Sequence, residues 1–201
     1  MDRLDRVLAA AAPLLRRIDD LLAAGGAPAD HRVWAELRRV RLLPGDAARG
    51  VAALSPRELL DAAPELRGNA RAYGALAAAL PGPGEWTGAA AEAYDAVRRR
   101  TAAHLSGGGE SLSARLEASA DLADGLAAWM VDARDAVADA LAQALSSAEA
   151  VALAGGGPGP PSPRELDAAA EIGALVLRAV ADGCLAGAAL LPNSAELAET
   201  H

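Results

Sequence analysis

The sequence contains no lysine, no phenylalanine and only one cysteine, and aromatic residues make up only 2% of its 201 residues. Its hydrophobic content of 52% is therefore mostly alanine and leucine, with few of the β-branched and aromatic residues that favour strands. This composition predicts an all-α protein held together by long, shallow helix–helix contacts. A single cysteine, Cys184, excludes an internal disulfide, and its apolar surroundings in the sequence predict a small buried thiol.

Positive charge is also scarce, because 27 acidic residues face 19 basic ones, all of them arginine, for a net charge of -8. A protein with this charge is not expected to be drawn to nucleic acid or to an anionic membrane surface. The absence of lysine is explained by codon usage in a GC-rich genome. We therefore expect neither a nucleic-acid partner nor membrane association.

None of the common catalytic arrangements is present in the sequence. The three histidines, His31, His104 and His201, lie far apart and have no cysteine or histidine at metal-ligand spacing. The glycine run after Ser106 lacks the lysine and the preceding strand of a phosphate-binding loop. The sequence thus predicts a non-enzymatic protein with no metal, no cofactor and no evident small-molecule substrate.

Proline and glycine divide the chain into four predicted regions. Residues 1–54 form an N-terminal helical extension, in which Pro13 should kink or restart the first helix. A second helix in this extension should begin with Asp30 as its N-cap and stop at Pro44-Gly45. The other regions are a helical hairpin at 55–154, a glycine and proline linker at 155–163, and an apolar helix with a tail at 164–201.

The predicted hairpin has two arms with apolar residues at alternating steps of four and three, a pattern typical of a helix that packs along another helix. The sequence Ser-Pro-Arg-Glu-Leu occurs at both Ser55 and Ser162 and predicts a capped helix start at each place. Pro81 to Gly84 should separate the arms, and three glycines from Gly107 should break the second arm. The side chains expected to pack in the seam or against a partner are Leu66, Tyr73, Tyr94, Leu126 and Trp129.

The last predicted helix, from Ile172 to Leu191, is apolar nearly all round and carries glycines four residues apart at Gly183 and Gly187. This spacing is common where membrane helices pack. Arg178 and Asp182 would each cost roughly 2.5 to 3.5 kcal/mol near the centre of a bilayer. We therefore expect a helix that is buried or covered by a partner.

Trp86-Thr87-Gly88 lies between the two arms, where its residues have a physical role. A tryptophan at such a turn can lay its ring across the open end of the seam, and glycine permits a tight reversal. Ala90 and Ala93 then allow close packing before Tyr94 returns to the seam. Together these residues resemble the turn of the WXG family, and the resemblance covers roughly residues 55–150.

The resemblance implies an antiparallel helical hairpin, extended here into a bundle, that forms a homodimer or heterodimer through helix packing. It also implies export by a type VII (ESX-type) secretion system without a cleaved signal peptide. Family members or their partners often carry a Y-x-x-x-D/E export signal, but Tyr94 is followed by Arg98 and Tyr73 by Ala77. The alternative is a cytosolic adaptor, chaperone or immunity-type protein for the product of a neighbouring gene.

Overall fold

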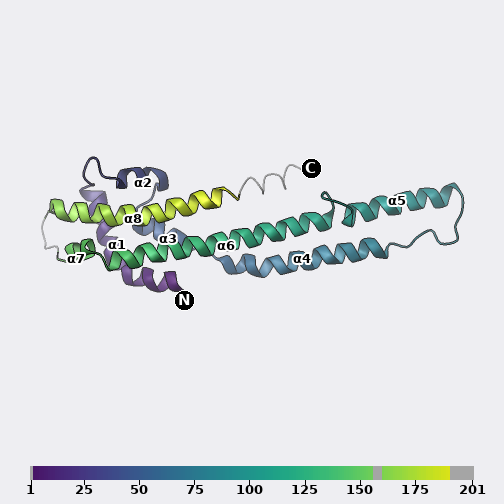
Figure 1. Ribbon diagram of the computed structural model, residues 1–201, viewed down its shortest axis with the longest axis horizontal. Coiled ribbons are helices and arrows are strands. Elements are labelled where there is room, and N and C mark those ends of the chain that lie inside the picture. Colours follow the sequence, from purple (N-terminus) through teal and green to yellow (C-terminus); the bar gives the residue numbers. More distant parts are fainter. Residues whose placement is uncertain (1, 156–159, 191–201) are drawn as a thin grey trace. The chain divides into compact units, whose positions relative to one another are not determined.

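The computed structural model describes residues 2–155 and 160–190, and its regular elements in these ranges are all α-helices (Figure 1). The predicted all-α helical bundle is therefore confirmed. The chain divides into two compact units. Unit 1 contains Met1–Ser55 and Ala128–Ala189, and unit 2 is built on Pro56–Ala127, so that the boundary falls within the long helix α6, Leu112–Leu145.

Unit 1 is organised around helix α8, Pro163–Ala188. The sequence placed this helix in a separate C-terminal region, whereas in the structure it contacts α1 (Arg3–Ala24), α2 (Val33–Val40), α3 (Pro44–Ala52) and α7 (Ala148–Ala154). Its start agrees with the prediction, because Ser162 and Glu165 form a reciprocal capping box. The expected end at Leu191 and residues 156–159 of the expected linker lie outside the described residues.

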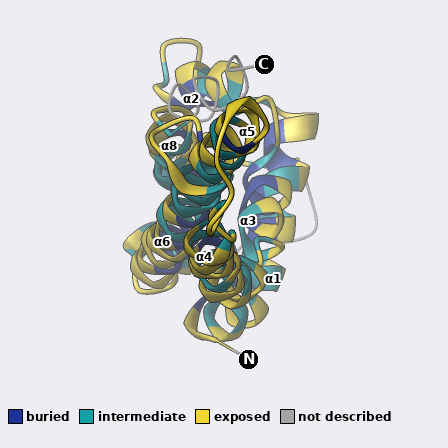
Figure 2. Ribbon diagram, turned by 90° about the vertical axis from the view of Figure 1, so that its right-hand side faces the viewer, coloured by how far each residue is buried: buried dark blue, intermediate teal, exposed yellow. Residues whose placement is uncertain are grey.

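The core of unit 1 contains large aliphatic side chains, and burial of each stabilises the fold by about 1.5 to 3 kcal/mol. They come from α1, α2, α8 and the C-terminal part of α6, where the ribbon is dark blue in Figure 2. Those less than 2% exposed include Leu4, Leu15, Ile18, Val33, Val137, Leu141, Val176 and Leu177. Unit 1 therefore has an ordinary hydrophobic core.

Helix α1 does not restart at Pro13, because it is continuous from Arg3 to Ala24. Buried residues on both sides of the proline, Ala11 and Leu15 among them, belong to the same core. This shared burial outweighs the loss of one helical hydrogen bond, which proline cannot donate.

The start and stop signals predicted for α2 were wrong. The imidazole Nδ1 of His31, and not Asp30, accepts a hydrogen bond from the Val33 backbone N–H at 3.1 Å. The helix ends before Arg41, and Pro44 begins α3 as its first residue. Proline suits that position because its missing N–H has no partner there in any helix.

The glycines of α8 pack against α6 within unit 1. A Cβ on Gly183 would lie 3.4 Å from the Cβ of Ala133, and one on Gly187 would lie 2.6 Å from the indole of Trp129. The paired small residues thus serve close packing of two helices. Among the described helices, none is by itself long and apolar enough to cross a membrane; α6 and α7 meet the length and composition criteria only as a pair bent by 62°.

Unit 2 contains α4 (Pro56–Ala79), α5 (Ala89–Ser106) and the first part of α6. The breaks fall where proline and glycine predicted them, at residues 80–88 and 107–111. Helix α5 contacts α4 after the first break, so the chain reverses and the two helices form an antiparallel hairpin (Figure 1).

Candidate functional site

The turn of the hairpin depends on the backbone conformation of Gly88. This residue has φ 86° and ψ -176° and precedes the first residue of α5. Residues with a side chain are strained in this region of φ. A Cβ added at Gly88 would meet no atom within 4 Å, so the glycine is required by its backbone angles and not by close helix approach.

The indole of Trp86 does not close the end of the seam, contrary to our prediction. Its side chain is 66% exposed, and its ring meets Tyr94 edge-on, with the ring centroids 5.9 Å apart. Trp86 therefore presents most of its surface to solvent.

Tyr94, and not Trp86, links the two arms of the hairpin at the turn. Its hydroxyl donates a hydrogen bond of 2.9 Å to the carbonyl oxygen of Pro81, at the end of the opposite arm. The ring is only partly covered, with 36% of the residue exposed. Tyr94 thus joins α5 to the loop after α4 and contacts the Trp86 ring.

The interior of unit 2 consists almost entirely of alanine. Between residues 56 and 127, no buried residue is larger than serine. Each alanine methyl contributes only about 0.8 kcal/mol when it is buried, far less than a leucine. Unit 2 therefore has little core of its own. Its buried residues are Ala63, Ala70, Ala91, Ser111, Ala120, Ala123 and Ala127.

The predicted seam residues are only partly brought together. Leu66 packs against the small cluster formed by Ala63, Ala120 and Ala123, while Tyr73 and Leu126 are half-buried. Trp129 belongs to unit 1, where its indole N–H donates to the Gly183 carbonyl oxygen at 2.7 Å. The structure therefore places Trp129 against α8 and outside the hairpin.

An ion-pair cluster between α4 and α6 was not predicted from the sequence. The Arg67 guanidinium lies 2.6 Å from a carboxylate oxygen of Asp121, 2.8 Å from one of Asp124 and 3.7 Å from one of Glu117. The three acids are spaced four and three residues apart, so they share one face of α6. The spacing of these acids was the one feature of the sequence that could have indicated the cluster. The members of the cluster are partly solvated, so the ion pairs add little to the free energy of unfolding. Their main effect is to set the register of the two helices.

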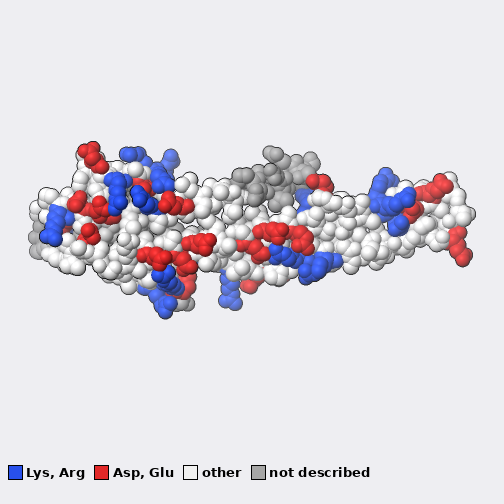
Figure 3. Space-filling view, viewed as in Figure 1, with Lys and Arg blue, Asp and Glu red and all other residues white. Residues whose placement is uncertain are grey.

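Apolar side chains on unit 2 remain in contact with solvent. Leu60, Leu76 and Val97 are each about half exposed, at 51%, 52% and 51%, in addition to Trp86. Figure 3 shows long uncharged stretches along the hairpin helices between clusters of charge. These side chains are the large apolar groups of unit 2 that a second surface could cover.

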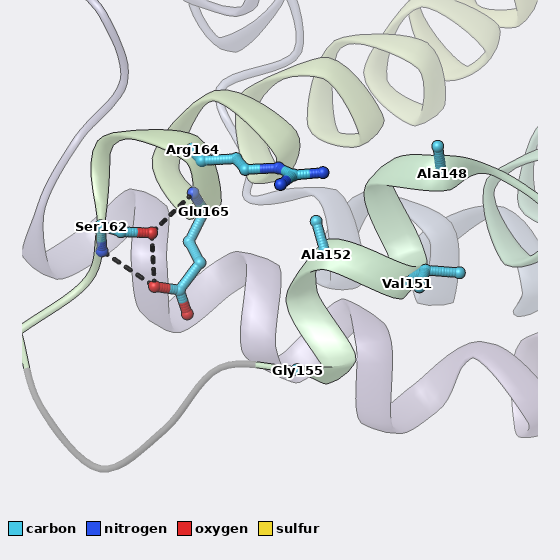
Figure 4. Close-up of a pocket in the computed structure, with 7 residues that line it drawn as sticks. All are labelled: Ala148, Val151, Ala152, Gly155, Ser162, Arg164 and Glu165. Atoms are coloured by element: carbon cyan, nitrogen blue, oxygen red, sulfur yellow. Dashed lines mark hydrogen bonds between the residues drawn. The ribbon is translucent and has the colours of Figure 1, made fainter.

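A hollow lies in unit 1 between α7 and the start of α8, with a volume of about 560 Å³ (Figure 4). Two of its polar residues are paired with each other, because the Ser162 backbone N–H and hydroxyl each donate to the Glu165 carboxylate at 2.8 Å. These bonds, with a further one from Arg17, lower the pKa of Glu165. The figure shows the Ser162 and Glu165 side chains turned toward each other, as a helix cap requires.

Metal-ligating side chains do not gather anywhere in the described ranges: no three His, Cys, Asp or Glu residues could hold an ion together. His31 lies beside Glu171, 3.1 Å from its carboxylate, and Cys184 is exposed, contrary to the buried thiol that we expected. Comparison with known protein families, with characterised proteins and with solved structures finds no match to this chain.

Proposed function

We propose that this chain is a non-enzymatic binding protein whose hairpin packs against a helical protein partner or a second copy. Within this class we propose a type VII secretion substrate, or the carrier of a co-secreted partner. The order of elements supports this assignment, since two arms with an alanine seam flank a Trp-x-Gly turn.

The observation that carries the proposal is the distribution of apolar side chains in unit 2. Its fully buried residues are alanine and one serine, and most of its leucines are partly buried. The side chains that are half exposed or more are those of Leu60, Leu76, Val97 and Trp86. Exposed apolar surface is costly in water and becomes favourable when another surface covers it. Trp86 at the turn has the size typical of an interface anchor, and its ring contacts Tyr94.

A photo-crosslinking experiment tests the binding surface. A benzophenone amino acid replaces Leu76 in the full chain, and the matched control replaces Arg71, which is exposed on the same helix about 140° round its axis. We expect a discrete protein adduct, with a partner or with a second copy, from position 76 and little from position 71. Equal labelling from both positions would contradict a defined interface.

A second candidate, a cytosolic adaptor or immunity-type protein, is favoured by the lack of a Y-x-x-x-D/E signal after either tyrosine. Fractionation of the native host distinguishes the two functions. A secretion substrate accumulates in the culture filtrate only when the type VII ATPase is present. Retention in cells of both strains would favour the adaptor.

A further inference from the structure

Unit 1 contains an apolar cavity of about 230 Å³ between the turn from α2 to α3, helix α6 and helix α8. We name it the Trp129 cavity. It is separate from the hairpin surface, because all of its lining residues belong to unit 1. Its larger lining side chains are Val40, Leu42, Val51, Leu54, Trp129 and Val180.

Small residues leave this space open. Ala47, Gly50, Ala133 and Gly183 also line the cavity. Gly50 lies inside α3, where alanine would favour the helix, and a Cβ added there would meet no atom within 4 Å. Gly50 is exposed, so the cavity is open to solvent on this side and a ligand can enter there.

The walls of the cavity are held in place before any ligand binds. The Trp129 indole is fixed by its hydrogen bond to the Gly183 carbonyl oxygen and by contact with the backbone at Gly187. At the rim, Leu42 is 48% exposed and follows Arg41, the one residue other than glycine with positive φ among those described. Arg41 ends α2 in this left-handed conformation, as helix C-terminal residues commonly do.

The lining chemistry defines the ligand. The indole N–H of Trp129 is already paired, and the remaining side-chain heteroatom in the lining is the weakly polar thiol of Cys184. A ligand that carries a charge or needs a strong hydrogen bond would lose its water without gaining a partner. An indole wall also favours stacked or edge-on contact with another ring.

We propose that the Trp129 cavity binds an uncharged aromatic or alicyclic molecule of about ten carbon atoms, since a cavity of about 150 Å³ holds benzene. The cavity gives this protein a small-molecule site that is independent of its helical partner. Naphthalene has the required size and chemistry and is the probe for the test.

The experiment follows the indole N–H signals of the ¹⁵N-labelled full chain by NMR during titration with naphthalene. The chain has three such signals, from Trp34, Trp86 and Trp129. We expect a saturable shift of the Trp129 signal alone, and a several-fold slower alkylation of Cys184 by iodoacetamide. We also expect 2-naphthoate to bind about tenfold more weakly, because its carboxylate finds no partner.

Two variants separate binding in the cavity from binding elsewhere. Gly50→Leu fills the cavity and should weaken naphthalene binding at least tenfold, while Gly125→Leu, also at an open helical glycine, should not. Circular dichroism of both variants establishes that they are folded. No saturable shift, equal shifts of all three indole signals, or undiminished binding by folded Gly50→Leu would each overturn the proposal.

Discussion

Replacing Arg134 by alanine should destabilise unit 1 strongly, because this one side chain joins two helix ends. Its Nη1 group donates to the Leu54 carbonyl oxygen at 2.9 Å and to the carbonyls of Val51 and Ala52, at the C-terminal end of α3. Its Nε donates to Asp2, the N-cap of α1, at 2.9 Å. The side chain is only 10% exposed, so water replaces few of these bonds when the guanidinium is removed.

The expected magnitude follows from these contacts. Removal of one partner from a buried charged network costs about 3 to 5 kcal/mol. The value here should lie near the lower end, about 3 kcal/mol, because Asp2 is half exposed and regains water. With a urea m-value of about 2 to 3 kcal/mol/M, the unfolding midpoint should fall by roughly 1 to 1.5 M.

Urea unfolding followed by far-ultraviolet circular dichroism measures this change. Arg134→Lys keeps the charge but not the planar fork of donors, so it should lie between the wild type and Arg134→Ala. Arg100→Ala, at an exposed position on α5, should change stability by less than about 0.5 kcal/mol. If Arg134→Ala and Arg100→Ala shift the midpoint equally, the role assigned to the buried guanidinium is wrong.

Four further changes have expected outcomes. Trp86→Ala should alter the free energy of unfolding by less than about 1 kcal/mol, because the ring is 66% exposed, yet reduce any crosslinking from the hairpin. Gly88→Ala should cost about 1 to 3 kcal/mol through its positive φ, measured by thermal unfolding. Gly187→Ala should cost about 1 to 3 kcal/mol and shift the NMR signal of the Trp129 indole, since the new Cβ would overlap the ring. The pKa of Asp2 is lowered by the hydrogen bond from the Asp5 backbone N–H and by Arg134. The ionised Asp2 carboxylate therefore stabilises the fold fully above its unfolded pKa, and this stabilisation is lost as the pH falls through its folded pKa. The difference in unfolding free energy between wild type and Asp2→Asn should accordingly shrink below about pH 4.

The local features of the fold were predictable from the sequence. The Ser162 cap, the break after Ser106 and the reversal before Ala89 all follow from residues within a few positions of the feature. Proline, glycine and capping side chains act on the neighbouring backbone, so their effects appear in a short window of sequence.

Contacts between distant segments were not predictable in the same way. Arg134 reaches Asp2 across more than a hundred residues, and no local pattern pairs them. The central position of α8 in unit 1 likewise depends on which helices meet in three dimensions. The position of Trp86 in the turn was clear from the sequence. The direction of its ring was not, because it depends on the residues of the opposite arm that lie near the ring.

The alanine interior of unit 2 has a consequence for the life of the protein in the cell. A hairpin that fully buries only alanine and serine, and leaves Leu60, Leu76 and Trp86 largely exposed, presents apolar binding surface to chaperones and proteases whenever it is alone. If binding to a partner covers that surface, a higher concentration of the partner leaves less of the chain free for chaperones and proteases. The steady-state amount of this chain should then rise and fall with the amount of its partner, even when its own transcription is constant.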